Sequence, residues 1–329
     1  MPETPEISVI IPSKDRCSRM QATLAGALGQ EDVALEVIVV DDGSTDGTYE
    51  RLSGLDDPRL RVVRNEQSQG ASRARNRGIA QARAEWLAFL DDDDLWAPRK
   101  LREQLDAAYA ASATVAYSSA LIVTDGLDPI EVNRAPKADL VRKDILRRMA
   151  IPGGCSNLIA AASLVHATGG FDENIHATAD WEFWTRLILD GVPVDCQDVH
   201  VAYVTHAGNM SVVDADRFSR EFDYLARKFQ EPRKAEGVEI DGVKFTRWLA
   251  GGYRRGGRPR DAIRTYMQGA VRYRNAGNVV RAIGTGLGEA AMRFGKGPRD
   301  AEPFDEPEWL ALYRPGGDLR GSQEASRAD

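Results

Sequence analysis

Short apolar runs alternate with polar stretches over the first hundred residues of the chain. Four runs rich in valine and isoleucine, at 7–12, 35–42, 60–65 and 85–92, are typical of buried strands in a parallel sheet. The stretches between them, at about 18–30, 45–54 and 71–84, favour helices. This order, βαβαβαβ, predicts a doubly wound α/β half over residues 1–112.

The alternation loosens after residue 98. We expect a helix over 98–111, strands near 114–124, a helix near 139–149 and a glycine-rich loop at 151–157. The stretch 179–191 predicts an amphipathic helix that ends at Gly191, and two strands should follow it, at 192–196 and 201–206. These elements form a second half over residues 113–230 and complete a first domain over 1–230.

The remaining third of the chain has a helical pattern. Pro259 suits a first helical turn, and Gly277 suits the end of that helix. One apolar stripe lies between them and consists of Ile263, Tyr266, Met267, Ala270 and Val271. We predict a helical appendage over 231–296 and a flexible, disordered tail over 297–329, which is proline-rich and acidic.

Composition and charge exclude several classes of protein. An apolar fraction of 43% in 329 residues suffices for a packed core, and a net charge of -7 argues against a protein that coats nucleic acid. The three cysteines are far apart and form no CxxC pair, which favours a reducing compartment over a disulfide framework or a zinc site. The chain has neither a signal-peptide pattern nor an apolar stretch near the ~18 residues of a membrane span. We therefore expect a cytoplasmic protein.

Four consecutive aspartates, in FLDDDDLW, follow the fourth predicted strand at residues 91–94, and Asp41 and Asp42 follow the second. Ligands of doubly wound sheets bind beyond the carboxyl ends of the strands. Adjacent ionised carboxylates repel one another, and Mg²⁺ or Mn²⁺ is commonly held by one or two carboxylates plus substrate phosphates. The run at 91–94 therefore predicts a divalent cation site. The Asp41 and Asp42 pair alone is equally well explained as a turn or a helix cap.

Four ordered motifs resemble glycosyltransferase family 2, a family of inverting enzymes with the GT-A fold. The motifs are ISVIIPSKDR, VIVVDDGSTDGT, GASRARNRGIAQA and WLAFLDDDDLWAPRKL, and the likeness runs over residues 7–110 and more thinly to about 211. It implies an α/β fold of GT-A type with a Rossmann-like, mostly parallel sheet, in which 1–112 is the nucleotide-binding half and 113–230 the acceptor half. It also implies the metal-dependent transfer of a sugar from a nucleotide diphosphate donor. UDP is the nucleotide we expect first. The acceptor would be a hydroxyl of a saccharide or a lipid-linked acceptor in cell-surface polysaccharide biosynthesis.

The resemblance implies roles for individual residues. Asp42 meets the base of the nucleotide, Asp92 the ribose, and Asp93 the metal ion that grips the diphosphate, while Asp91 is the first aspartate of the commoner spelling of this motif. Further residues of the nucleotide pocket are Pro12, Ser13, Lys14, Asp15, Arg75 and Asn76. Lys14 stands where the family usually has a tyrosine, which favours a phosphate or base-edge contact over stacking.

An inverting transfer also needs a carboxylate that deprotonates the acceptor hydroxyl. The sequence TADWEFWTRL resembles the helix start where the family places a Glu-Asp pair before aromatic residues, and it gives this role to Asp180, although Ala179 stands in place of the glutamate. An aspartate at a helix start is also a common N-cap, and Glu182 is the nearest rival base. Trp181 and Trp184 are as consistent with a core position as with stacking on a sugar.

His206 resembles a histidine that follows the last core strand in many members and sometimes binds the metal, but a lone histidine is as often structural. Gly153 and Gly154 correspond to a stretch that approaches donor and acceptor in the family, and they are also ordinary turn residues.

Basic residues gather between Lys244 and Lys296, where ten arginines face only Asp261 and Glu289. This excess indicates either an anionic surface, such as a bilayer or an acidic partner, or a solvated face that balances an acidic core. No nucleic-acid recognition motif accompanies it. We predict peripheral contact with the inner face of the cell membrane, and the sequence leaves open whether the helical end forms an oligomer.

Two alternative functions fit parts of the pattern. A nucleotidyltransferase also uses carboxylates and metal, although PSKDRCSRM is a poor version of its triphosphate loop. A catalytically inactive module that binds a sugar nucleotide would fit Ala179 and Lys14. A dehydrogenase is disfavoured because no GxGxxG follows the first strand.

Overall fold

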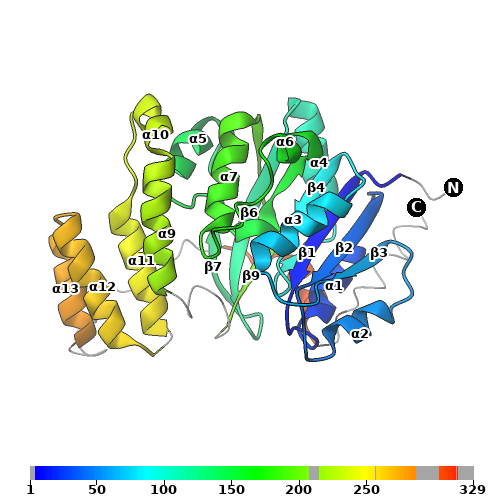
Figure 1. The fold of residues 1–329 in the computed structure, drawn as a ribbon, viewed down its shortest axis with the longest axis horizontal. Helices are drawn as coiled ribbons and strands as arrows, with labels where there is room; N and C mark the ends of the chain where they lie inside the picture. Colours follow the sequence, from blue (N-terminus) through cyan, green and yellow to red (C-terminus); the bar gives the residue numbers. More distant parts are fainter. Residues whose placement is uncertain (1–3, 207–214, 256, 287–303, 316, 318–329) are drawn as a thin grey trace. The chain divides into compact units, whose positions relative to one another are not determined.

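The computed structural model describes residues 4–206, 215–255, 257–286, 304–315 and 317. Its contacts divide the chain into two compact units (Figure 1). The first unit comprises Met1–Ile145, Ala150–Thr205 and Asp305–Asp329, and the second comprises Leu146–Met149 and His206–Phe304. The main boundary between the units therefore falls at His206, earlier than the boundary predicted at residue 230.

The first half of the first unit, residues 1–112, has the predicted order of strands and helices. Its four strands are parallel and lie in the order β3-β2-β1-β4. The strands are β1 (Ile7–Ser13), β2 (Leu35–Asp41), β3 (Leu60–Arg64) and β4 (Trp86–Phe89). The helices that connect them are α1 (Met20–Leu28), α2 (Thr48–Ser53) and α3 (Ala71–Gln81). All residues of β1, β2 and β4 are buried, which explains their unbroken apolar runs.

The second half extends the same sheet to nine strands. Its strands are β5 (Leu95–Trp96), β6 (Val115–Thr124), β7 (Pro129–Asn133), β8 (Ile159–Ala161) and β9 (Pro193–Thr205). β9 pairs parallel with β6, whereas β5, β7 and β8 run antiparallel to their neighbours, so six of the nine strands share one direction. The prediction of two strands at 192–196 and 201–206 was wrong. They are one strand, because its register with β6 shifts at Ser119 and accommodates Gln197 and Asp198 as a bulge.

Helices cover both faces of the sheet. Side chains that alternate along β1 and β2 point to opposite faces: Val9 and Val39 pack with α1 and α4, whereas Ile38 packs with Ala74 of α3. The remaining helical elements of this unit are α4 (Lys100–Ala111), α5 (Ala138–Arg147, which continues into the second unit), the 3₁₀ helix η1 (Gly154–Asn157), α6 (Ala162–Ala167) and α7 (Ala179–Asp190).

The second unit is helical where the structure describes it. Its helices are α9 (Ala215–Lys228), α10 (Gln230–Glu236), α11 (Gly242–Arg255), α12 (Pro259–Arg272) and α13 (Ala276–Gly286). Gly277 does not end a helix as predicted but lies in the first turn of α13, because Arg274 adopts a positive φ of 49° and the Asn275 side chain accepts a hydrogen bond from the Asn278 backbone. None of the described helices has an apolar stretch long enough to cross a bilayer.

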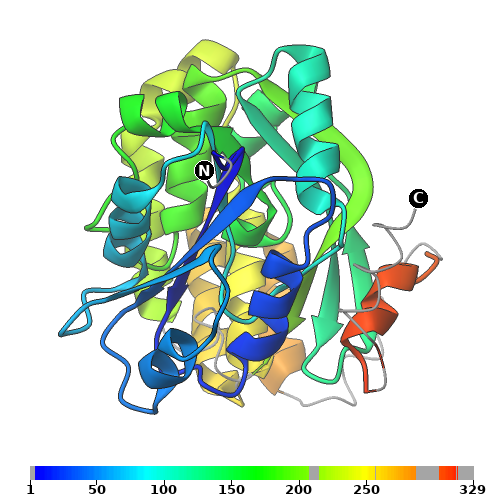
Figure 2. The same ribbon diagram turned by 90° about the vertical axis from the view of Figure 1, so that its right-hand side faces the viewer.

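Part of the predicted tail is ordered. Residues Glu308–Tyr313 form a 3₁₀ helix, η2, that belongs to the first unit and is drawn in red in Figure 2. Leu310 is fully buried, the Trp309 indole donates to the Val199 carbonyl at 3.0 Å, and the Tyr313 hydroxyl donates to the Trp96 carbonyl at 2.6 Å. The prediction of disorder over 297–329 was therefore wrong for this segment, because the apolar residues of EWLALY offset the polar and charged residues around them.

Candidate functional site

The aspartate run lies in a loop between β4 and β5, at the carboxyl end of the parallel strands. Ser156 of η1 organises this loop, since its hydroxyl accepts a hydrogen bond from the Asp91 backbone at 3.1 Å and donates to the Asp94 carboxylate. The Asp94 carboxylate also accepts from the Val204 backbone at 3.0 Å and is fully buried. Burial, together with the charges of Asp93 and Asp91, raises its pKa well above the usual range. Asp94 therefore fastens the loop to η1 and β9.

Asp92 and Asp93 both lie near the Arg16 guanidinium. The Arg16 guanidinium lies 3.5 Å from Asp92 Oδ1 and 3.7 Å from Asp93 Oδ2, distances too long for strong hydrogen bonds. Burial and the charge of Asp93 raise the pKa of Asp92 to about 7, against the opposing charge of Arg16. Two neighbouring carboxylates at the strand ends suit a hard divalent ion such as Mg²⁺ or Mn²⁺, which prefers oxygen ligands. The residues at this end of the sheet fit the predicted cation.

Asp91 points to a different partner. Its carboxylate accepts a hydrogen bond from the Arg75 guanidinium at 2.5 Å. Arg75 is buried on α3 and lies over the Phe171 ring, with 5.3 Å between the guanidinium carbon and the ring centroid. Asp180 also acts on Arg75 through its charge. Arg75 thus stands between the aspartate loop and the predicted base.

Three phenylalanines set the position of Asp180. Phe89 ends β4 two residues before the loop, Phe183 lies on α7 one turn after Asp180, and their ring centroids are 5.5 Å apart. Phe171 stacks on Phe183 at 4.0 Å and meets Phe89 at 5.3 Å. These contacts join the start of α7 to the strand that carries the loop. The close approach also explains Gly154, because a Cβ atom there would lie 3.3 Å from Asp180 Oδ2 and its φ is +53°.

Asp180 has the electrostatics of a base at neutral pH. Burial raises the pKa of Asp180 to about 6, while the hydrogen bond from the Trp181 backbone at 2.7 Å opposes this rise. The rival carboxylate, Glu182, is fully buried and bound to Arg186 at 2.7 Å through both oxygens. Trp181 and Trp184 are core residues, which is the simpler of the two interpretations of their spacing.

The carboxylate of Asp42, at the end of β2, is surrounded by donors. It accepts hydrogen bonds from the Asn65 amide at 2.7 Å, the Ser68 hydroxyl at 2.8 Å and the backbone N–H groups of Gln69 and Gly70. Burial alone would raise the pKa of Asp42, but these bonds lower it below its usual value. Asp42 holds the loop between β3 and α3, and its predicted contact with the nucleotide base stays a prediction.

The other predicted nucleotide residues lie at the end of β1 and in the middle of α3. Pro12 and Ser13 are buried in β1, and a side-chain interaction with Ser13 acts to lower the pKa of Asp92. Lys14 is exposed, and Asp15 accepts a hydrogen bond from the Thr45 backbone at 2.8 Å. Ser13 is thus a buried polar group beside the strand ends that carry the aspartates.

Asn76 contacts a different segment. Its amide donates to the Phe171 carbonyl at 2.9 Å and accepts from the Phe171 backbone at 2.8 Å. These bonds brace the turn that leads into α7, and a role of Asn76 in nucleotide binding stays a prediction.

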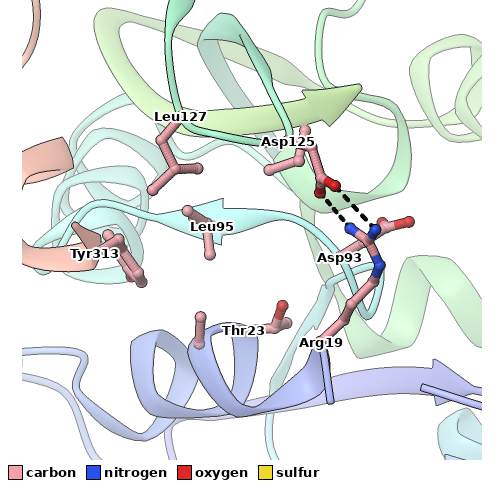
Figure 3. Close-up of a pocket in the computed structure, with 9 residues that line it drawn as sticks. Arg19, Thr23, Asp93, Leu95, Asp125, Leu127 and Tyr313 are labelled. Carbon is pink, nitrogen blue, oxygen red and sulfur yellow. Dashed lines mark hydrogen bonds and ion pairs between the residues drawn. The ribbon is translucent and has the colours of Figure 1, made fainter. Parts of the chain in front are cut away.

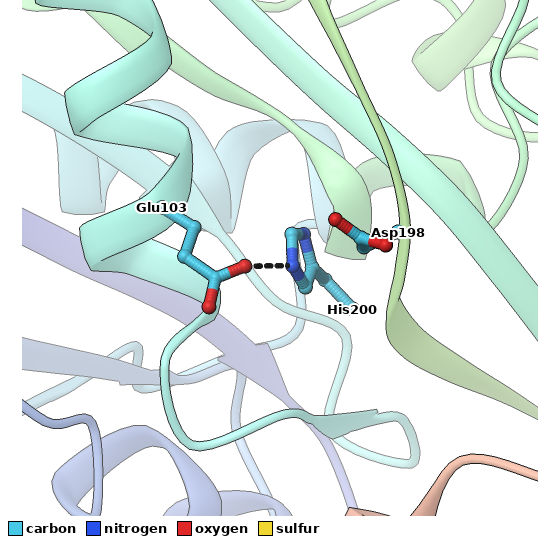
Figure 4. Close-up of side chains that lie close together, drawn as sticks. All are labelled: Glu103, Asp198 and His200. Atoms are coloured by element: carbon cyan, nitrogen blue, oxygen red, sulfur yellow. Dashed lines mark hydrogen bonds and ion pairs between the residues drawn. The ribbon is translucent and has the colours of Figure 1, made fainter.

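Of two histidines, His206 is a predicted metal ligand and His200 lies in an acidic group. His206 directly follows Thr205, the last residue of β9, and begins the second unit, and its role as a metal ligand stays a prediction. Figure 4 shows His200 with Glu103 and Asp198, and one nitrogen or oxygen from each lies within 4.8 Å of the others. His200 Nε2 is already hydrogen-bonded to Glu103 Oε2 at 2.7 Å. Glu103 and His200 therefore form a hydrogen-bonded pair beside the exposed Asp198.

A cavity of about 170 Å³ borders the aspartate loop (Figure 3). The side chains that line it include Arg19, Thr23, Asp93, Leu95, Asp125, Leu127 and Tyr313. Arg19 and Asp125 form a two-point ion pair across it, with one contact at 3.1 Å. The cavity brings the end of the chain, through Tyr313, beside the loop.

Sequence reasoning missed Arg16, Ser156 and Tyr203 as members of this site. Burial and the charges of Asp94, Asp93, Asp91 and Asp180 raise the pKa of Tyr203, a residue of β9. Arg16 lies inside the quoted motif ISVIIPSKDR, directly after Asp15, so its position in the motif was a usable signal. Ser156 and Tyr203 carry no local signal, because only the fold brings β9 and η1 to the loop.

Solved structures share this architecture. The chain resembles S. aureus TarS 1–349 in complex with UDP-GlcNAc, with a TM-score of 0.54 and 18% identity over 92% of this chain and 95% of that one. It also resembles the mannosyltransferase PcManGT from Pyrobaculum calidifontis in complex with GDP-Man and Mn²⁺, with a TM-score of 0.52 and 17% identity over 89% of this chain and 83% of that one. At these identities the likeness establishes the fold, which is GT-A.

Sequence relatives lead to the family. Residues 8–166 match the model of "Glycosyl transferase family 2". The putative teichuronic acid biosynthesis glycosyltransferase TuaG of Bacillus subtilis is 32% identical over 57% of this chain and 73% of its own length. The Escherichia coli protein WfaP, a UDP-Glc:alpha-D-GlcNAc-diphosphoundecaprenol beta-1,3-glucosyltransferase, is 32% identical over 67% of this chain and 85% of its own. The chain therefore belongs to glycosyl transferase family 2 and is a glycosyltransferase.

Proposed function

We propose that the enzyme transfers a sugar, with inversion, from a nucleoside diphosphate donor to a hydroxyl group of a saccharide or lipid-linked acceptor. The observation that carries this proposal is the arrangement of Asp92 and Asp93 at the strand ends, with Asp180 joined to the same strand through Phe89 and Phe183. One set of carboxylates suits the donor side, and a single carboxylate of raised pKa suits the acceptor side.

UDP is our first choice of nucleotide. TarS was solved with UDP-GlcNAc, and the name of WfaP includes UDP-Glc, whereas PcManGT was solved with GDP-Man. We place the reaction in cell-surface polysaccharide biosynthesis, because TuaG is named for teichuronic acid biosynthesis and WfaP for a diphosphoundecaprenol-linked acceptor. The three free cysteines of the chain support a cytoplasmic location.

The residues of the site divide the work of a single displacement. Asp93, with Asp92 beside it, would hold Mg²⁺ or Mn²⁺, and such an ion would supply positive charge that stabilises the departing diphosphate. Asp180 removes the proton of the acceptor hydroxyl as that oxygen attacks the anomeric carbon. Arg75 donates a hydrogen bond to Asp91 and interacts with the charge of Asp180, so it links the aspartate loop to the proposed base.

Thermal unfolding with UDP, GDP, dTDP and CDP tests the proposal, each nucleotide being added with Mn²⁺ and with a chelator. A ligand that binds only the folded state raises the melting temperature by mass action. We expect a rise with UDP and Mn²⁺ that the chelator removes. A rise with another nucleotide would replace UDP in the proposal, and no rise with any of the four would contradict a working donor site.

A second measurement separates an active enzyme from an inactive binding module. Membership of family 2 does not distinguish an active enzyme from an inactive module, since both would bind the donor. Turnover therefore has to be measured. We expect slow release of UDP from a UDP-sugar in the absence of acceptor, and faster release when a matching acceptor is added. Donor binding without any release of UDP would identify the module.

A further inference from the structure

The apolar stripe predicted for α12 is divided between buried and exposed positions. Tyr266 and Ala270 are buried, but Met267 and Val271 are 42% and 79% exposed. Helix α13 adds Val280 and Ile283, which are 65% and 56% exposed. Four large aliphatic side chains thus lie in solvent within two consecutive helices that pack on each other. Elsewhere in the described chain such residues are scattered, so these four need a specific explanation.

Helical geometry places arginines on the same stripe of α12. Arg260, Arg264, Met267 and Val271 follow one another at intervals of four, three and four residues, which is the spacing of one helix face. The opposite face, with Ala262 and Gly269, is buried, and Gly269 lies so close to Thr246 of α11 that a Cβ atom would meet its side chain at 2.3 Å. The mixed stripe is therefore the outer face of α12.

The charge of this hairpin is strongly one-sided. Asp261 is the one acidic residue in α12 and α13, and it is paired with Arg258 at 2.8 Å. The exposed arginines without an ion-pair partner among the described residues are Arg260, Arg264, Arg274 and Arg281. Arginine side chains can bury their methylene stems against apolar surface and keep the guanidinium at a polar boundary.

We propose that the α12–α13 hairpin is a docking surface for an anionic lipid bilayer. The exposed aliphatic side chains would enter the boundary between headgroups and acyl chains, and the four arginines would pair with lipid phosphates. A second copy of the chain fits less well, because a symmetric contact through this face would bring the same arginines against one another. The inference goes beyond the transferase reaction and does not depend on it.

Vesicle co-sedimentation of the full chain tests the proposal. The probes are vesicles of phosphatidylcholine alone and of phosphatidylcholine with about 30% phosphatidylglycerol. We expect at least about tenfold stronger partition onto the anionic vesicles, and a marked loss of partition at about 0.5 M salt, where charges are screened. Equal partition onto both vesicle types, or no partition onto either, would overturn the proposal.

Paired variants separate the hairpin from the rest of the surface. Val271→Glu with Val280→Glu, and Arg260→Glu with Arg264→Glu, should each lower partition about tenfold or more. The matched controls are Leu140→Glu with Ile130→Glu and Arg51→Glu with Arg134→Glu, which change exposed residues of the first unit in the same way. Equal losses in variants and controls would contradict a specific surface.

The same variants exclude the competing occupants. Unfolding temperatures and nucleotide binding should match those of the unmodified chain in all four, because none of these residues lies in the donor site. A concentration-dependent dimer in sedimentation velocity that Val271→Glu with Val280→Glu dissociates, without any vesicle binding, would assign the face to a second copy and overturn the proposal.

Discussion

The ends of β2 and β4 carry the same sequence signal and have opposite physical characters. Asp42 accepts hydrogen bonds from four residues of its own chain, which lower its pKa. The Asp92 carboxylate lies 3.5 Å from the Arg16 guanidinium, and burial and the charge of Asp93 raise its pKa to about 7. A carboxylate satisfied by its own fold completes a loop, whereas one that faces other carboxylates carries a repulsion that a bound cation or a proton would relieve. An aspartate after a strand therefore needs its donors counted before it is given a role.

Asp93→Ala should have the largest effect on the β4 side of this comparison. Loss of a carboxylate that holds the cation removes several kcal/mol of charge stabilisation, so transfer should fall about a thousandfold or more. The Mn²⁺-dependent rise in melting temperature with nucleotide should disappear as well. Asp106→Ala, an exposed residue on α4, is the control and should retain both properties. Normal nucleotide binding in the Asp93 variant would remove the loop from the donor site.

Asp180→Asn extends the comparison to a third carboxylate, whose pKa is raised although no metal role is assigned to it. Donor binding should persist while kcat falls about 10²–10⁴-fold, because the general base is lost. In the unmodified enzyme, kcat/KM should decline as pH falls below about 6, since the base becomes protonated there. A flat profile between pH 5 and about 7.5 would separate turnover from Asp180.

Glu182→Gln is the matched variant. It breaks a buried pair with Arg186, so it should lower the free energy of unfolding by about 3–5 kcal/mol yet retain turnover at low temperature. Loss of turnover in this variant, with retention in the Asp180 variant, would exchange the two roles.

Asp42→Asn and Asp92→Asn should shift stability differently when metal is absent. The first replaces an acceptor oxygen by an amide and leaves buried donors unsatisfied, so the free energy of unfolding should fall by about 2–3 kcal/mol. The second relieves repulsion between neighbouring carboxylates, so unfolding should become harder or change by less than about 1 kcal/mol. Urea unfolding with chelator measures both. Equal destabilisation would contradict the contrast between the two strand ends.

Arg16→Ala should have the smallest effect, and in an unusual direction. Because Arg16 lies where its charge competes with a divalent ion for Asp92 and Asp93, its removal should tighten Mn²⁺ binding without nucleotide about two- to fivefold. Titration calorimetry measures this affinity directly. Arg16→Lys keeps the charge and should bind Mn²⁺ like the unmodified chain. Weaker binding in the alanine variant would show that Arg16 supports the cation site instead of competing for it.

The fold of residues 1–112 was predictable because its information is local. The strands β1, β2 and β4 are buried along their whole length, so their apolar runs are unbroken. Aspartates stand at the end of β2 and shortly after the end of β4. The register of β1 with β2 brings Ser13 opposite Asp41. Once the strands are known to be parallel and adjacent, this pairing alone brings the first two motifs side by side. The resemblance to the family added the roles of these residues.

The other half depends on contacts that sequence order does not reveal. The bulge at Gln197 and Asp198 made one strand read as two, because a polar interruption looks the same in a bulge and in a loop. Ser156 and Tyr203 reach the aspartates only through the fold, which packs η1 beside the aspartate loop and pairs β9 with β6 and β5. The aromatic residues of η2 were hidden in a proline-rich, acidic context, which outweighed them in the prediction of disorder.

The position of η2 has a consequence for how the enzyme is made. Tyr313 is hydrogen-bonded to the Trp96 carbonyl, two residues beyond the aspartate run, and lines the cavity beside Asp93. During synthesis the ribosome has produced all four family motifs some two hundred residues before it reaches Tyr313. A nascent or prematurely terminated chain therefore carries the aspartates without this part of their surroundings.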